Sequence, residues 1–297
     1  MKKTLLFTVA YKQPHLFYKD FFNCIQEQDT KEFDLLIINE GINLEQFTSK
    51  LSIDVNNLYA SGNIVDNRML AFNYAVVNGY ENILALDIDD YCSSNRISTI
   101  IKALENCDIY VHDLTLVNVY KQLYKDNFVG NRFHYGNIFY KDILDKNFIG
   151  FGNSGFKVRL LKGIQVIPNS IIAVDWFVFS IFLLNNVTVI YEQRTLTYYR
   201  QHNENIAGAE IKSIQQLKQQ INILDKHYKA LLGYMIENNI CKYINEINEY
   251  INNINTIIIM QLYERLNNYI KLRFKKNDYI WWELINISVK EFNKWQA

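Results

Sequence analysis

The sequence lacks several features that would assign it directly to a class of protein. Its four cysteines, Cys24, Cys92, Cys107 and Cys241, lie far apart and form no CxxC pair. This spacing argues against a disulfide framework and a zinc site, and indicates reduced thiols in a cytoplasmic protein. Lys plus Arg and Asp plus Glu each total 31, so no net charge attracts a polyanion and nucleic-acid binding is not expected.

Long apolar runs are also missing. None approaches the ~20 residues that a membrane-spanning helix needs. The first residues, MKKTLLFTVAYKQP, begin like a signal peptide, but Lys12 and Pro14 interrupt the apolar run and no small-residue cleavage site follows. We therefore expect a first β-strand there, in a soluble protein. The 49% apolar content is sufficient for one large or two modest domains.

Strand and helix patterns alternate over the first third of the chain. Strands are expected at 3–10, 33–39, 82–87 and 108–113, and helices at 15–27, 67–77 and 96–106. Ser93 and Ser94 are expected to cap the helix at 96–106. Such alternation predicts right-handed crossovers and an α/β fold with a mainly parallel sheet. Ligands of such sheets bind at the carboxyl ends of the strands.

The second half of the chain changes character. A strand at 151–159, a helix at 175–186 and a strand at 187–192 are expected before the pattern becomes helical at about residue 209. We therefore expect a domain at 1–208 and an all-helical domain at 209–297.

An isoleucine seam and a mixed basic and aromatic segment mark the helical part. The seam has alternating spacings of four and three: Ile240, Ile244, Ile247, Ile251, Ile254 and Ile258. It is expected either to join a second copy or to fold back on the first domain. The later segment, 269–285, combines four cations with three aromatic residues: Lys271, Arg273, Lys275, Lys276, Tyr279, Trp281 and Trp282. Peripheral contact with an anionic membrane and a solvated helix face are both compatible with it.

The segment LALDIDD, 84–90, places three carboxylates directly after a buried strand: Asp87, Asp89 and Asp90. Helix capping would need only one of them. An EF-hand calcium loop is excluded because Tyr91 and Cys92 stand where it needs glycine. A phosphatase of the haloacid dehalogenase type, using Asp87 and Asp89, remains an alternative, although Tyr91 stands where such enzymes have Thr or Val. A divalent cation that bridges carboxylates and a diphosphate would cancel the repulsion among the acids.

Four segments in order resemble the family 2 glycosyltransferases, which have the GT-A nucleotide-sugar-binding fold. They are FFNCIQEQDTKEFDLLIINEG, NRMLAFNYAVVNGYENILALDIDD, IPNSIIAVDWFVFSIFL and TYYRQHNENIAG, which together lie within the first 208 residues. The resemblance implies a Rossmann-like sheet with flanking helices and a Mn²⁺- or Mg²⁺-dependent transfer of a sugar from a nucleotide diphosphate. A glycan or lipid-linked hydroxyl would accept the sugar, with inversion, during synthesis of cell-surface polysaccharide at the cytoplasmic face of the membrane.

The resemblance also implies individual roles. The nucleotide would contact six residues: Thr8, Ala10, Tyr11, Glu40, Arg68 and Asp87. The cation would be held by Asp89, Asp87 and His202. Glu40 stands beside Asn39 where the family has an Asp for the pyrimidine base, which leaves the identity of the base open. Asp90 would meet the sugar, and Arg200 would lie near the phosphates.

Asp175 and Trp176 would form the acceptor side. Asp175 would be the base that removes the acceptor proton, since attack on the anomeric carbon from the far side needs one. Trp176 would wall the acceptor site. An ordinary helix cap at Asp175 and a catalytically silent interaction module remain alternatives.

Overall fold

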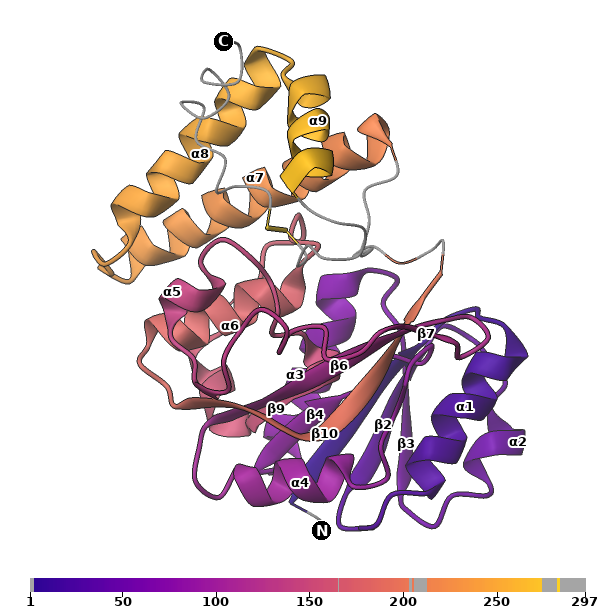
Figure 1. Cartoon of the computed structure of the whole chain (residues 1–297). Coiled ribbons are helices and arrows are strands. Elements are labelled where there is room, and N and C mark those ends of the chain that lie inside the picture. Colours follow the sequence, from indigo (N-terminus) through magenta and orange to yellow (C-terminus); the bar gives the residue numbers. More distant parts are fainter. Residues whose placement is uncertain (1–2, 165, 203–204, 206–212, 274–281, 284–297) are drawn as a thin grey trace.

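The computed structural model describes residues 3–164, 166–202, 205, 213–273, 282 and 283. It contains a ten-stranded sheet with the strand order β3-β2-β1-β4-β9-β6-β10-β5, in which β7 pairs with β6 and β8 with β10 (Figure 1). The strands are β1 (Thr4–Ala10), β2 (Asp34–Asn39), β3 (Val55–Tyr59), β4 (Asn82–Ala85), β5 (Tyr91–Cys92), β6 (Ile109–Asn118), β7 (Leu123–Lys125), β8 (Gly136–Asn137), β9 (Ser154–Lys157) and β10 (Val189–Gln201).

Helices flank the sheet and follow it. They are α1 (His15–Gln26), α2 (Glu45–Thr48), α3 (Ile64–Val77), α4 (Arg96–Ala103), α5 (Tyr140–Ile143), α6 (Val174–Leu184), α7 (Ile214–Glu237), α8 (Ile244–Ile259) and α9 (Tyr263–Arg273). Two 3₁₀ helices, η1 (Phe151–Asn153) and η2 (Val158–Gly163), flank β9. The expected α/β class with helices at the carboxyl-terminal end is therefore confirmed.

The four strands β3, β2, β1 and β4 are parallel neighbours. Both faces of β1 are buried: Leu5 and Phe7 pack into one apolar core, and Leu6 and Ala10 into the other. A parallel strand covered on both faces has a nearly continuous apolar sequence, as β1 does except at Thr4 and Thr8. This register brings the carboxyl ends of β1, β2 and β4 to one edge of the sheet.

Two local expectations are corrected. The strand expected at 151–159 is only Ser154–Lys157, and it runs antiparallel between β4 and β6, so the sheet is mixed. The cap residue of α4 is Asn95 rather than Ser93 or Ser94, and it forms no side-chain cap bond. Ser93 instead accepts a hydrogen bond from the backbone N–H of Arg96 through its carbonyl oxygen.

The isoleucine seam folds back within the chain. The buried residues of α8 are Ile247, Ile251, Ile254 and Ile257. Ile258, which was expected in the seam, is 39% exposed, and Ile257 takes its place on the buried face. Figure 1 shows α7 between α8 and the layer of α5 and α6. The hydroxyl of Tyr228 on α7 donates to the carbonyl of Leu144 at 2.8 Å. One apolar core therefore includes residues from both expected domains.

The expected boundary at Gly208 lies outside the described residues, as do Lys275, Lys276, Tyr279, Trp281 and the side chain of Arg273 from the basic and aromatic segment. No described helix combines the length and apolar character needed to cross a membrane.

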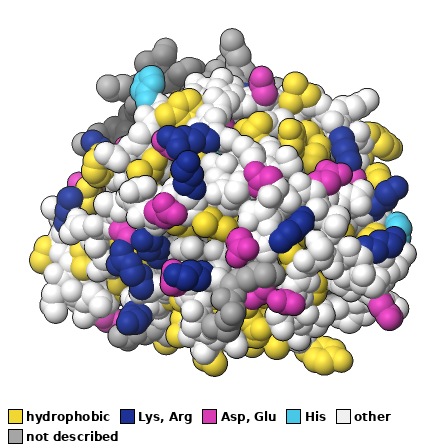
Figure 2. All heavy atoms as spheres, turned by 90° about the horizontal axis from the view of Figure 1, so that it is seen from below, with side chains coloured by type: hydrophobic (Ala, Val, Ile, Leu, Met, Phe, Trp, Pro, Cys, Tyr) yellow, Lys and Arg dark blue, Asp and Glu magenta, His cyan; other side chains and the backbone are white. Residues whose placement is uncertain are grey.

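Charged side chains of both signs intermingle on the face seen from below (Figure 2). On the described surface, Lys3 pairs with Glu81 at 2.9 Å, and Arg159 pairs with Asp108. Both pairs lie at the end of the sheet where strands β1 and β6 begin. Opposite charges in contact leave little field of one sign to steer a charged partner there.

Candidate functional site

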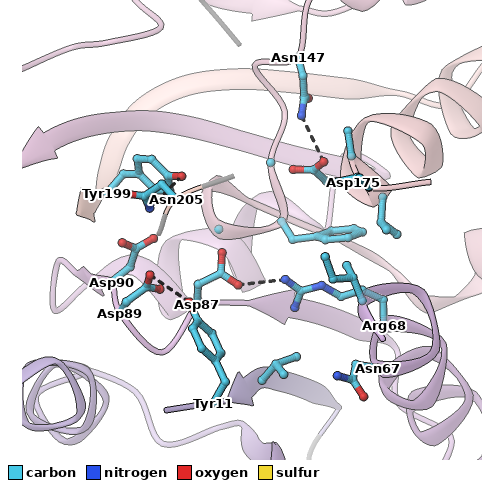
Figure 3. A pocket seen from close by; sticks show the side chains of 18 of the residues that line it. Tyr11, Asn67, Arg68, Asp87, Asp89, Asp90, Asn147, Asp175, Tyr199 and Asn205 are labelled. Carbon is cyan, nitrogen blue, oxygen red and sulfur yellow. Dashed lines mark hydrogen bonds and ion pairs between the residues drawn. The ribbon is translucent and has the colours of Figure 1, made fainter. Parts of the chain in front are cut away.

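A cavity of about 420 Å³ lies at the carboxyl ends of β1, β2 and β4, between α3 and the first turn of α6 (Figure 3). Its lining gathers residues from distant parts of the sequence: Val9, Tyr11, Glu40, Gly62, Asn63, Ile64, Asn67, Arg68, Asp87, Asp89, Asp90, Leu114, Asn147, Gly150, Phe151, Gly152, Asn153, Ile172, Ala173, Val174, Asp175, Tyr199, Asn205 and Trp282. All three carboxylates of the LALDIDD segment are among them. The cavity occupies the position predicted from the parallel sheet.

The three carboxylates have different surroundings. Asp87 pairs with Arg68 at 3.0 Å and is partly exposed. Asp89 is buried, and its Oδ2 accepts from the Tyr11 hydroxyl at 3.1 Å and lies 2.7 Å from Nε2 of His202.

Asp90 is the most buried of the acids. Its Oδ1 accepts from the backbone N–H of Arg200 at 2.8 Å, while its Oδ2 has no hydrogen-bond partner within the described part of the chain. Burial, followed by repulsion from Asp89 and Asp87, raises the pKa of Asp90 well above its usual value. A positive group beside this oxygen would relieve both effects.

The local chain path explains how these groups meet. After β4 the backbone turns, with the N–H of Asp90 donating to the carbonyl of Asp87 at 3.0 Å. The next residues form β5, where Cys92 pairs with Thr197 of antiparallel β10. This pairing brings the end of β10, and with it His202, to the acids.

Arg68 is held against the cavity by α3. Asn63 caps the start of this helix, and its side chain accepts from the N–H of Asp66 at 2.8 Å. The Arg68 guanidinium lies over the rings of Phe7 and Phe151, at 5.4 and 5.5 Å from their centroids. Its Nη1 has no described hydrogen-bond partner. The guanidinium thus has an unused donor in addition to its pair with Asp87.

Asp175 is the second residue of α6 and lines the opposite wall of the cavity. Its Oδ1 accepts from the N–H of Trp176 at 2.8 Å and from Nδ2 of Asn147 at 3.2 Å. Burial raises the pKa of Asp175 to about 6, although both hydrogen bonds and the charge of Arg68 act in the opposite direction. A carboxyl group with this pKa can accept a proton near neutral pH.

A divalent cation fits part of this arrangement. Within the ranges that the structure describes, no three His, Cys, Asp or Glu side chains form a ready metal site. Two good ligand atoms are nevertheless in contact, Oδ2 of Asp89 and Nε2 of His202, and the unpartnered Oδ2 belongs to the adjacent Asp90. Mg²⁺ and Mn²⁺ commonly use few protein ligands and complete their shell with phosphate oxygens and water.

Two predicted nucleotide contacts are corrected. Thr8 and Ala10 are fully buried and do not line the cavity. Successive side chains of a strand point to opposite faces, so Val9 and Tyr11 reach the cavity instead. Tyr11, Glu40, Arg68 and Asp87 all line the cavity, and their contact with a nucleotide stays a prediction.

The predicted acceptor wall is also corrected. Trp176 is fully buried, its Nε1 donates to the carbonyl of Ile143 at 2.7 Å, and its ring stacks on His227 with centroids 3.9 Å apart. One residue along a helix turns the side chain by about 100°. Trp176 therefore points toward α7, whereas Asp175 points into the cavity.

Arg200, which was expected near the phosphates, does not line the cavity. Its fully buried guanidinium pairs with Asp20 at 2.8 Å, donates to the carbonyl of Asp89 at 2.7 Å and lies over Phe17. Its neighbour Tyr199 lines the cavity, so the alternation of β10 directs Arg200 away from it. Arg200 supports the acid segment from behind.

Several lining residues were missed from the sequence. Val9 could have been predicted from Tyr11, because residues two apart along a strand face the same side. Asn67 precedes Arg68 on α3, and its Oδ1 accepts from the N–H of Ser61 at 2.8 Å. Asn147 and Trp282 carry no local signal, because only the tertiary fold brings them to the cavity.

Several known structures share the fold of this chain. No family profile and no curated protein matches the sequence. TarS of S. aureus, residues 1–349 in complex with UDP-GlcNAc, has a TM-score of 0.60 and 15% identity, with 93% of this chain and 76% of that chain covered. The mannosyltransferase PcManGT from Pyrobaculum calidifontis, in complex with GDP-Man and Mn²⁺, has a TM-score of 0.58 and 10% identity. The match covers 92% of this chain and 76% of that chain. At these identities the likeness shows a shared fold, the GT-A fold of glycosyltransferases.

Proposed function

We propose that the protein is a metal-dependent glycosyltransferase that uses a nucleotide diphosphate sugar. The observation that carries the proposal is one cavity holding Arg68 and the three acids on one side and Asp175, with a pKa of about 6, on the other. Its fold is shared with enzymes whose structures contain UDP-GlcNAc, or GDP-Man and Mn²⁺. This shared fold favours sugar transfer over the phosphatase alternative.

The donor would occupy the side of the cavity formed by β1, β2 and α3. Tyr11 and Glu40 line the part at the ends of β1 and β2, where the base and ribose would lie with Asp87. Arg68 would donate its unused Nη1 to the diphosphate. A charge-assisted hydrogen bond of this kind is stronger than a neutral one and suits phosphate geometry.

Asp89 and His202 would hold the divalent cation, and Asp87 and Asp90 would surround it with negative charge. The bound cation would stabilise the charge that develops on the leaving diphosphate. Asp89 is already oriented by Tyr11, and the neighbouring backbone by Arg200. The protein therefore fixes one of these ligands before the donor arrives.

Asp175 would act as the general base. The acceptor oxygen would form a bond to the anomeric carbon, the bond from that carbon to the diphosphate oxygen would break, and the hydroxyl proton would pass to Asp175. Direct attack from the face opposite the leaving group inverts the anomeric centre. Asp175 and the acids come from opposite walls of the cavity, as this reaction requires (Figure 3).

We further propose a glycan or lipid-linked acceptor and a role in cell-surface polysaccharide synthesis at the cytoplasmic face of a membrane. The family resemblance of the sequence supports this setting. Contact with the membrane through the basic and aromatic segment belongs to the same proposal, whereas a homodimer through the isoleucine seam does not. The burial of Ile247, Ile251 and Ile254 leaves little of the seam for a second copy.

Thermal-shift titrations test the proposal. UDP, GDP, UDP-GlcNAc and GDP-mannose are each added to the full chain with Mn²⁺ and with EDTA. One donor should raise the melting temperature when Mn²⁺ is present and not when EDTA is present. A ligand that binds only the folded state stabilises it. Sugar transfer should then be detected with that donor. No stabilisation by any nucleotide, with or without metal, would favour the silent interaction module.

A further inference from the structure

Asn147 lies in the loop between α5 and η1. Among the described residues, its side-chain nitrogen has a hydrogen-bond partner and its side-chain oxygen has none. Its side chain is 4% exposed, and its Nδ2 donates to Oδ1 of Asp175 at 3.2 Å, as Figure 3 shows. Its own Oδ1 is buried and has no hydrogen-bond partner among the described residues. A buried amide with one end unsatisfied costs free energy that an apolar side chain of similar size would not.

The contact with Asp175 also fixes which way the amide faces. If the amide were rotated by 180°, its oxygen would face a carboxylate oxygen, which repels it, and the hydrogen bond would be lost. The unsatisfied oxygen is therefore the consequence of directing Nδ2 at Asp175.

The loop itself is held firmly around Asn147. The next residue, Phe148, is buried and stacks on Phe133 with centroids 4.3 Å apart. Its carbonyl accepts from Nδ2 of Asn153 at 3.1 Å, and Oδ1 of Asn153 accepts from the N–H of Gly150 at 2.7 Å. The amide of Asn147 is thus presented from a backbone that other contacts keep in place.

We propose that Asn147 is a positioning residue for Asp175: it keeps the carboxylate turned toward the cavity and favours its ionised form. This inference rests on the proposed role of Asp175 as the base. Other groups act on the same carboxylate: the Trp176 N–H and Arg68 also favour ionisation, whereas Asp87 opposes it, and Tyr199 lies close enough for its pKa to be raised by Asp175. The bond to Asp175 is the one hydrogen bond that the Asn147 side chain forms among the described residues.

The test is a titration of the full chain labelled with ¹³C at the aspartate carboxyl groups. The Asp175 resonance is assigned as the one lost in Asp175→Asn. Removing the amide in Asn147→Ala should raise the pKa of Asp175 by roughly half to one unit, because a hydrogen bond to the ionised form is lost. Asn147→Asp, which keeps the shape but adds a like charge, should raise it further. Asn185→Ala removes an amide at the far end of α6 and should leave the titration unchanged.

An unchanged Asp175 titration in both Asn147 variants would overturn the inference, even if their melting temperatures fell. If UDP-GlcNAc proves to be a donor, the acid limb of its hydrolysis should move to higher pH in Asn147→Ala by the same amount. A chain that binds no nucleotide but still shows the titration shift would refute the proposed function and retain the pairing of Asn147 with Asp175. The two failures are thereby separated.

Discussion

Nε2 of His202 lies 2.7 Å from Oδ2 of Asp89, although 113 positions separate them in the chain. The antiparallel pairing of β5 with β10 brings them together, since β5 follows the acids directly and β10 ends just before His202. Both atoms can bind a divalent cation, and they are in direct contact with each other. The pair is therefore the clearest candidate for a cation site in the described part of the chain.

Asp89→Asn should abolish the effect of Mn²⁺ on nucleotide binding. The neutral amide keeps the shape but is a poor ligand for a hard cation. Isothermal titration of the preferred nucleoside diphosphate, with Mn²⁺ and with EDTA, should give equal and weak affinities. Asp126→Asn, on the exposed turn after β7, is the control and should keep the dependence on metal.

Asp175→Asn should lower the transfer rate by roughly 10²- to 10⁴-fold and leave donor affinity unchanged, because a general base acts in the chemical step. In the unmodified protein the rate should fall about tenfold per pH unit below the pKa of Asp175, about 6. A pH–rate profile for both proteins measures this. An unaltered rate in the variant would remove Asp175 from the mechanism.

The same substitution should stabilise the fold at neutral pH. The folded state raises the pKa of Asp175, so folding favours the protonated form and the ionised form carries a penalty above about pH 6. Asp175→Asn removes that penalty, on the order of 3 kcal/mol at pH 8. The gain should shrink as the pH falls from about 6 and vanish below the unfolded value of 3.8. Urea unfolding at pH 8 and pH 4 compares the two limits.

Arg68→Lys should weaken binding of the nucleoside diphosphate roughly tenfold to a hundredfold, because a single ammonium replaces a fork that can meet Asp87 and a phosphate together. The melting temperature of the free protein should change little. Arg194→Lys, an exposed arginine paired with Glu192, is the matched control. Equal affinities in the two variants would place the diphosphate elsewhere.

Arg200→Leu should act on stability. It leaves the buried Asp20 with fewer partners, and breaking a buried pair of this kind costs about 3–5 kcal/mol. The double variant Asp20→Asn/Arg200→Leu should be less destabilised than Arg200→Leu alone, because no buried charge is left without its partner. Denaturant titration of both variants measures the difference. If Arg200 bound phosphate, nucleotide affinity would fall while the free energy of unfolding stayed the same.

Ile254→Ala should cost about 2–4 kcal/mol of stability, since the side chain is fully packed between helices. Ile259→Ala, at a position that is 79% exposed, should stay within about 0.5 kcal/mol. Both unfolding transitions should be independent of protein concentration. A concentration-dependent midpoint, lost in Ile254→Ala, would show instead that the seam joins two copies.

Much of the fold could be predicted from periodicity. The strands at 4–10 and 34–39 and the helices at 15–26 and 64–77 follow from apolar patterns, and the acids after β4 follow from an apolar run that stops abruptly. Edge and short strands such as Val55–Tyr59 were missed, because partly exposed residues with two asparagines carry little strand signal. The placement of β9 between β4 and β6 depends on long-range pairing that no local pattern records.

The errors in the site have one physical origin. Thr8, Arg200 and Trp176 each lie one residue from a side chain that does line the cavity, namely Val9, Tyr199 and Asp175. A motif locates a segment, whereas the face that a residue presents depends on the register of the strand or the turn of the helix. Neutral amides such as Asn147 could not be found at all, because only the folded chain shows what they touch.

The stacking of Trp176 on His227 links the wall of the cavity to helix α7. One turn of α6 presents Asp175 to the cavity and Trp176 to α7, so the helical region packs behind the proposed base. A chimera that exchanged residues 213–273 for an unrelated bundle would leave a large indole without its cover. The cavity wall at Asp175 therefore depends on the helical region for its support.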